Sequence, residues 1–256
     1  MGEGVALMDA PFLTVGLLPR FQDTKENSMN PTISITNKSK TVSDRDLKRK
    51  LPALQKQITQ QFEPVWGWGA NLKFDAKKFD MQVVIKDSAR GGGGYLGYHI
   101  KDNIPITYIF AKDDIEDSGE YTSTLSHELL EMIADPGVNL YAIGKFRDKG
   151  GQRRSGLFGL EVCDPVEANY YKIDGVSVSD WVRPEWFEPE HLKGKMKMDF
   201  LGVVDAPFMI AEGGYADVLS RGRWHTLRGS KAKVKRVRHR ADARKEVARW
   251  ASRKAG

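Results

Sequence analysis

The segment from Thr122 to Pro136 constrains the fold more than any other, because its side chains form two separate lines on a helix. Apolar residues recur at i, i+4, i+7 and i+8, the spacing of a core-facing stripe, at Leu125, Leu129, Met132 and Ile133. A second line, at i, i+4 and i+8, is polar and consists of His127, Glu131 and Asp135. Each of these residues is rotated only about 40° round the helix axis from the one before. Glu128 lies about 100° round from His127. We therefore expect a helix from about Gly119 to Ala134 with one core face and one polar face.

The polar line has the geometry of the HExxH zinc helix, with Glu131 in the place of the second histidine. One helical turn brings His127 and Glu131 close enough to share an ion, and both side chains are accepted zinc ligands. Glu128 is left free to act as the general base that takes a proton from water. We expect a divalent metal, zinc first, with calcium or manganese as alternatives because a carboxylate ligand makes the site harder. The competing interpretation is an amphipathic helix whose polar face is solvated.

A second acidic cluster, EVCDPVE at residues 161–167, favours the metal interpretation. A further ligand is needed to complete the set, and Glu161, Asp164 or the nearer Asp135 could supply it. If residues 160–163 form a strand, alternation puts Glu161 and Cys163 on one face and Asp164 on the other. Cys163 is a soft donor, but a lone cysteine is more often a small buried apolar residue.

The remaining segments predict an α+β domain with a mixed sheet. A strand is expected at residues 32–37, followed by a helix that Ser43 caps; Pro52 either kinks this helix or marks its true start. Residues 144–156 are expected to form a loop rich in glycine and arginine. Further strands are predicted at residues 81–86, 106–112, 160–163, 170–173 and 176–182. The predicted division is an N-terminal arm over residues 1–30, a folded domain over 31–218 and a basic tail over 219–256.

Positive charge is concentrated at the C-terminal end of the chain. The net charge is +6, but residues 220–256 hold 14 Lys and Arg against 2 acids, so the rest carries −6. Nucleic-acid binding is therefore expected of the tail alone, through Lys231, Lys233, Lys235, Arg236, Arg238 and Arg240. No apolar run approaches the roughly 20 residues of a bilayer span, so no membrane partner is expected. The single cysteine, Cys163, fits a reducing compartment.

Several motifs together resemble a group of uncharacterised phage and bacterial proteins. They are SHELLEMIADP, EVCDPVE, GVSVSDWVRPEWF, QQFEPVWGWGANLKF, GYLGYH at Gly94 to His99 and GGY at Gly213 to Tyr215. The likeness covers roughly residues 33–216. A looser one extends to secreted plant and fungal proteins of the Exordium type, which pair a helix HExxExxTDP with a following EIGDxC. The resemblance implies a zincin-like mixed sheet with an active-site helix, and an edge strand at Ile106 to Lys112 that binds extended substrate by strand addition. It implies no particular reaction.

Two functions are consistent with these features. The first is a zincin-like metal-dependent hydrolase with a peptide or protein substrate, whose base and ligands come from His127, Glu128, Glu131, Asp135, Glu161 and Asp164. The second is a phage virion structural or accessory protein with a non-catalytic core, whose tail contacts nucleic acid or neighbouring virion subunits. The expected location is the cytoplasm of a bacterial host or the phage particle. For His99, a structural role is favoured over a ligand or catalytic role.

Overall fold

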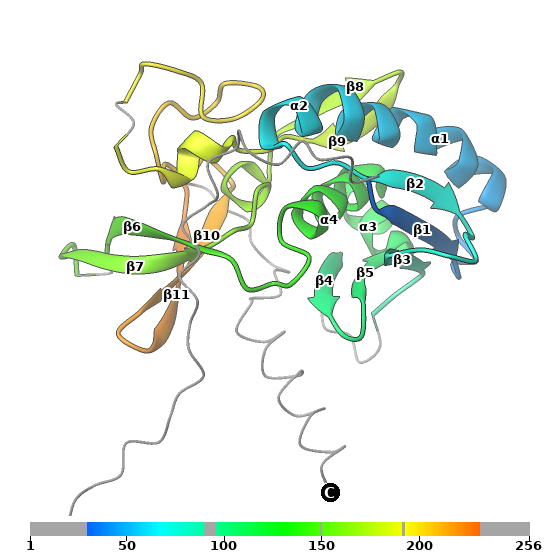
Figure 1. Cartoon of the computed structure of the whole chain (residues 1–256), viewed down its shortest axis with the longest axis horizontal. Helices are drawn as coiled ribbons and strands as arrows, with labels where there is room; N and C mark the ends of the chain where they lie inside the picture. The colour runs from blue at the N-terminus through cyan, green and yellow to red at the C-terminus, as the bar shows by residue number, and fades with distance from the viewer. Residues whose placement is uncertain (1–29, 90–95, 149, 191–192, 231–256) are drawn as a thin grey trace, which may run out of the picture.

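The described part of the chain folds into a mixed α+β architecture with three sheets and few helices (Figure 1). The computed structural model describes residues 30–89, 96–148, 150–190 and 193–230. The strands in these ranges are β1 (Thr32–Asn37), β2 (Asn71–Phe74), β3 (Met81–Lys86), β4 (Gly97–Lys101), β5 (Pro105–Phe110), β6 (Tyr141–Arg147), β7 (Arg153–Gly159), β8 (Tyr170–Ile173), β9 (Val176–Ser179), β10 (Tyr215–Ser220) and β11 (Arg223–Arg228). The helices are α1 (Asp44–Lys56), the π-helix η1 (Gln57–Phe62), α2 (Glu63–Trp66), α3 (Ala111–Ser118), α4 (Thr122–Ala134) and the 3-10 turns η2 (Asp164–Val166) and η3 (Pro184–Phe187). Among the described helices, none has both the length and the apolar character needed to span a membrane.

The larger sheet has the order β2-β1-β3-β5-β4, and only its edge strand β4 runs antiparallel to its neighbour. One face of its central strands is fully buried, and Ile33, Val83 and Ile85 on that face have no exposed surface. The edge strand predicted at residues 106–112 is wrong, because β5 lies between β3 and β4 and ends where α3 begins. The edge position belongs to β4, which the turn at residues 102–104 folds back alongside β5.

The first long helix is continuous through Pro52, so this proline neither breaks it nor marks its start. Ser43 caps α1 by accepting a hydrogen bond from the backbone N–H of Asp46, which confirms the predicted cap. The helix passes directly into η1 and α2, and its apolar stripe is fully buried at Leu47, Leu54, Ile58 and Phe62. Burying these side chains at about 1.5–3 kcal/mol each outweighs the roughly 3 kcal/mol that an interior proline costs.

The second sheet is antiparallel, in the order β11-β10-β7-β6. It occupies the region where the sequence predicted a loop at residues 144–156, and that prediction is wrong because β6 and β7 form a hairpin there. In β6 the buried residues Ala142, Gly144 and Phe146 alternate with exposed ones, so charges on the outer face hid the strand. The hairpin of β10 and β11 spans the boundary predicted after residue 218, so the folded part extends to Arg228.

Most of the two predicted extensions lies outside the described residues, although residues 219–230 of the tail are described. Of the N-terminal arm at residues 1–30, only Asn30 is described. The tail residues predicted to contact nucleic acid also lie outside, namely Lys231, Lys233, Lys235, Arg236, Arg238 and Arg240. Binding of nucleic acid or virion subunits by the tail therefore stays a prediction.

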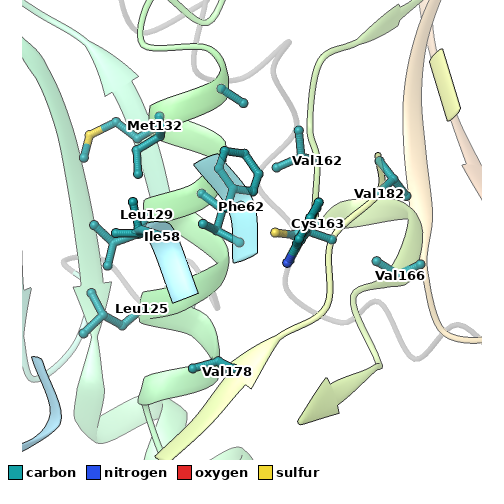
Figure 2. Close-up of a cluster of buried hydrophobic side chains, with 14 of the residues drawn as sticks. Ile58, Phe62, Leu125, Leu129, Met132, Val162, Cys163, Val166, Val178 and Val182 are labelled. Atoms are coloured by element: carbon teal, nitrogen blue, oxygen red, sulfur yellow. The ribbon is translucent and has the colours of Figure 1, made fainter. Parts of the chain in front are cut away.

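Helix α4 lies between the larger sheet and the second sheet (Figure 1). Strands β4 and β5 pack against it, and so does β9 of the β8–β9 hairpin. Figure 2 shows Leu125, Leu129 and Met132 along α4, with Cys163 directing its sulfur toward the helix from the segment after β7. The helix begins at Thr122 rather than near residue 119, because residues 111–118 form the separate helix α3. Cover from several elements buries most of α4, including much of its polar side.

Two aspartates, Asp180 and Asp199, face each other in the core and are 0% and 1% exposed. Asp180 Oδ1 accepts hydrogen bonds from the backbone N–H groups of Trp181 and Leu201, at 2.8 and 3.2 Å. Burial, and then the hydrogen bond and charge of Asp199, raise the pKa of Asp180 from its ordinary 3.8 to about 8. The folded chain therefore keeps a proton that the unfolded chain releases, and this contribution to stability is lost as pH rises from about 4 to 8.

Replacing Asp180 by asparagine is expected to remove this pH dependence. The amide keeps the Oδ1 acceptor and supplies a permanent donor to Asp199 in place of the proton. Relative to wild type, Asp180→Asn should be close to neutral at pH 4 and stabilising by on the order of 2 kcal/mol at pH 8. Urea unfolding at a series of pH values measures this difference. The exposed replacement Asp117→Asn is the control, and an Asp180→Asn effect that does not grow with pH would rule out a shared proton.

Candidate metal centre

The polar side chains of α4 are buried, which excludes a solvated helix face. Glu128 is 8% exposed and Glu131 is 3% exposed. They are covered by β4 from the larger sheet and by the segment of residues 161–164 that leads into η2. Buried carboxylates need donors or a cation to offset the cost of losing water. This side of α4 is therefore a candidate binding site.

The first group of donors joins α4 to η2. His127 Nε2 lies 3.3 Å from Glu131 Oε2 and 3.1 Å from Asp164 Oδ1. One donor atom from each residue lies within 4.8 Å of the other two, a spacing that could hold a metal ion. The second oxygen of Glu131 accepts hydrogen bonds from the backbone N–H of Cys163 at 3.1 Å and of Asp164 at 3.3 Å. Glu131 is thus fixed through Oε1 and presents Oε2 to the group.

The second group joins α4 to β4. His99 Nδ1 lies 3.2 Å from Glu128 Oε2 and 3.9 Å from Glu131 Oε2. These three residues also place one donor atom each within 4.8 Å of the others. On the other side of the imidazole ring, His99 Nε2 lies 3.8 Å from Glu161 Oε2. Glu131 is therefore shared by both groups.

Two close backbone approaches allow these groups to form. A Cβ at Gly97 would lie only 3.0 Å from side-chain atoms of Glu128 and Thr124, so a larger residue would push β4, and His99 with it, away from α4. A Cβ at Gly214 would overlap the backbone carbonyl of Pro165 in η2. The next residue, Tyr215, is buried and donates a hydrogen bond to Asp164. The second sheet thereby supports a donor of the first group.

Burial and crowding of like charges shift the ionisation of the site. Burial, followed by the charge of Glu131, raises the pKa of Asp164 to about 7. Burial also raises the pKa of Glu131. For His99, burial lowers the pKa, but the hydrogen bond with Glu128 and the charge of Glu161 outweigh it and raise the pKa to about 9. Burial is therefore the main reason why these carboxyl groups resist ionisation, while the surrounding carboxylates favour the protonated form of His99.

Most of the predicted site residues come together. His127, Glu131 and Asp164 form the first group, and Glu128 lies in the second. Glu161 approaches the second group through His99.

Asp135 does not join either group. Its carboxylate accepts hydrogen bonds from the backbone N–H of Asn139 at 3.1 Å and of Leu140 at 2.9 Å, and so stabilises the turn after α4. Two steps of about 40° carry it about 80° round the helix axis from His127. Its prediction as a ligand is therefore not supported by the geometry.

The strand predicted at residues 160–163 is wrong, and this explains why Glu161 and Asp164 reach neighbouring positions. The segment is irregular, because the N–H groups of Cys163 and Asp164 bond to the Glu131 side chain rather than to a strand. Strand alternation therefore does not separate Glu161 from Asp164. Cys163 is fully buried, and burial raises the pKa of its thiol well above the ordinary value, which agrees with an apolar role.

No family model, curated protein or solved structure matches this chain. The donor geometry of the chain itself therefore has to carry any functional conclusion. His99 belongs to the candidate site, although the sequence favours a structural role for it because a lone histidine is usually structural. The available signal was its position two residues after Gly97, because alternate residues of a strand share a face.

The donor set fits a divalent cation. Each group offers one imidazole nitrogen and two carboxylate oxygens. Zinc accepts both kinds of donor, and the predominance of oxygen also suits manganese and calcium. These carboxylates are buried, which distinguishes them from the exposed acidic clusters that are common on protein surfaces.

Proposed function

We propose that this protein is a metal-dependent hydrolase that acts on peptide bonds, with a zincin-like relation between α4 and the larger sheet. The observation that carries the proposal is the meeting of His127, Glu131 and Asp164 at one buried point, with Glu128 on the same helix beside them. Three protein ligands and a neighbouring carboxylate are the parts that a catalytic metal site requires.

Each residue has a separate role in this proposal. His127, Glu131 and Asp164 hold one divalent ion, and the backbone hydrogen bonds to Glu131 keep its carboxylate oriented. The ion supplies positive charge that polarises a carbonyl group and makes water more acidic. Glu128 accepts the proton, and His99 Nδ1 lies 3.2 Å from its Oε2.

The position of β4 supports a peptide as the substrate. This strand lies at the edge of the larger sheet and carries His99 into the site. Within the described residues, no strand pairs with its outer side. An extended peptide can add to such an edge as a further strand, through its backbone hydrogen-bonding groups. This would place the substrate backbone along the strand that borders Glu128.

The replacement Glu128→Gln tests the proposal. It keeps the shape of the side chain but removes the proton acceptor, so hydrolysis should fall by about 10²–10⁴-fold. The variant should still bind at least one divalent ion per chain, because the first group is intact. Cleavage is measured on fluorescently labelled casein and on a mixture of synthetic peptides analysed by mass spectrometry, with zinc, manganese or calcium added separately.

The matched control is Glu116→Gln, an exposed glutamate on α3 that pairs with Lys112. It should hydrolyse at the wild-type rate. Equal cleavage by wild type and Glu128→Gln, or metal-loaded wild type that cleaves none of the probes, would contradict the proposed function.

A further inference from the structure

Two potential ion positions overlap at Glu131. The His127–Glu131–Asp164 group and the His99–Glu128–Glu131 group each satisfy the spacing for a metal ion, and both include Glu131. Within the described residues, no such group contains both histidines. A single ion bound to the first group would therefore leave His99 and Glu128 without a role as ligands. Two neighbouring ions would use every donor.

We propose that the site binds two divalent ions, with Glu131 as the bridging carboxylate. The first ion is held by His127 and Asp164, and the second by His99 Nδ1 and Glu128. This inference rests on the proposed function only for the first ion. Bridged pairs of this kind lie about 3.5–4 Å apart in two-metal hydrolases.

The charge of the cluster favours two ions over one. Four buried carboxylates, each no more than 8% exposed, line the site at Glu128, Glu131, Glu161 and Asp164. When the three carboxylate ligands and Glu161 are all ionised, they carry four negative charges, so one divalent ion leaves two of these charges uncompensated and two ions leave none. Uncompensated charge is costly at such depth, which makes a second cation the more stable arrangement.

The surroundings of His99 point to a ligand rather than to a counter-ion. Its Nε2 is buried and makes no hydrogen bond within the described part of the chain, stopping 3.8 Å from Glu161 Oε2. A protonated imidazole would need a partner at both nitrogens. A metal-bound imidazole uses one nitrogen for the ion and directs the other N–H toward a carboxylate that orients the ring. Nδ1 toward Glu128 and Nε2 toward Glu161 match that pattern.

The donor inventory is also that of known dinuclear centres. Two histidines and four carboxylates are the side chains of the di-iron and di-manganese carboxylate sites in helical bundles. Manganese prefers oxygen ligands to sulfur ligands, so this oxygen-rich donor set suits it. Glu128 can contribute to the second ion through Oε2 and keep its other oxygen for the proton.

The test is to count ions with manganese alone as the probe. The full chain is stripped with a chelator, dialysed against Mn²⁺, and analysed for manganese per chain and by electron paramagnetic resonance. Wild type should hold two ions that give the spectrum of a coupled pair. His99→Ala should hold one ion with the six-line spectrum of isolated Mn²⁺. Glu161→Gln, which keeps the side-chain shape, should weaken the second ion by about 10–100-fold.

The control His225→Ala removes a histidine of β11 whose ring contacts Phe146 and which belongs to neither donor group, and it should keep two ions. One ion in wild type, unchanged in His99→Ala and Glu161→Gln, would overturn the second ion and leave the proposed function intact. No ion in wild type would overturn the proposed function itself. Two ions in every variant, or two uncoupled ions in wild type, would overturn the bridged assignment. If His99→Ala does not fold, Glu161→Gln and the wild-type spectrum decide.

Discussion

Replacing Glu131 by glutamine is expected to abolish metal binding and hydrolysis together. Glu131 is the only residue common to both donor groups, so its charge contributes to every ion that the site can hold. Loss of a partner that merely orients a ligand costs 10–100-fold in metal affinity, and loss of this ligand should cost about 100-fold or more. Equilibrium dialysis against zinc or manganese, with casein cleavage in parallel, measures both effects.

The same replacement should leave the fold intact, which makes its result interpretable. Glutamine retains Oε1, the oxygen that accepts hydrogen bonds from Cys163 and Asp164. The far-ultraviolet circular dichroism spectrum should therefore match that of wild type, as should that of the surface control Glu116→Gln. A Glu131→Gln protein that binds metal as tightly as wild type would show that these donors do not form the site.

Removal of divalent ions should lower the melting temperature of the wild-type protein substantially. A ligand at about 1,000 times its dissociation constant stabilises the folded state by about 4 kcal/mol. For a folded region of this size, 1 kcal/mol corresponds to about 2–4 °C, so addition of a chelator should lower the melting temperature by about 8–16 °C. Adding zinc or manganese back should restore it.

In the presence of chelator, Glu131→Gln should not lower the melting temperature relative to wild type. This result would distinguish a loss of ion binding from a loss of side-chain packing. Without an ion, the wild-type site confines four carboxylates, and glutamine removes one of the repelling charges. The variant should then melt at or above the temperature of chelated wild type and should not respond to added metal. Differential scanning calorimetry of both proteins, with and without chelator, decides the point. A melting temperature of wild type that is indifferent to the chelator would contradict a buried ion.

Elements whose sequence signal is local are predicted correctly. The apolar stripe of α4 and the Ser43 cap each depend on residues within a few turns of one helix, and both were found. The strands at residues 32–37, 81–86 and 170–173 have the predicted bounds, because β-branched and aromatic residues cluster there.

Features that depend on partners distant in the chain are not predicted by local sequence patterns. The bonds from Cys163 and Asp164 go to Glu131, more than thirty residues earlier, and no local pattern at residues 160–163 reveals this. The sequence does not predict β6, β7 and β11, because each carries exposed lysine or arginine residues that resemble a loop or a tail until the buried face is known. His99 was undervalued for the same reason, since its partner Glu128 lies 29 residues later.

The metal donors come from three separate stretches of the chain, and this determines at which stage of folding the site forms. Alone, α4 supplies only part of each donor group, namely His127 and Glu131 of the first and Glu128 and Glu131 of the second. Strand β4 must first pair with the larger sheet, and η2 must pack against Gly214 and Tyr215. Since these contacts span much of the chain, they form late, and a partly folded intermediate should capture ions poorly. Ion uptake during refolding should therefore follow the completion of tertiary structure instead of preceding it.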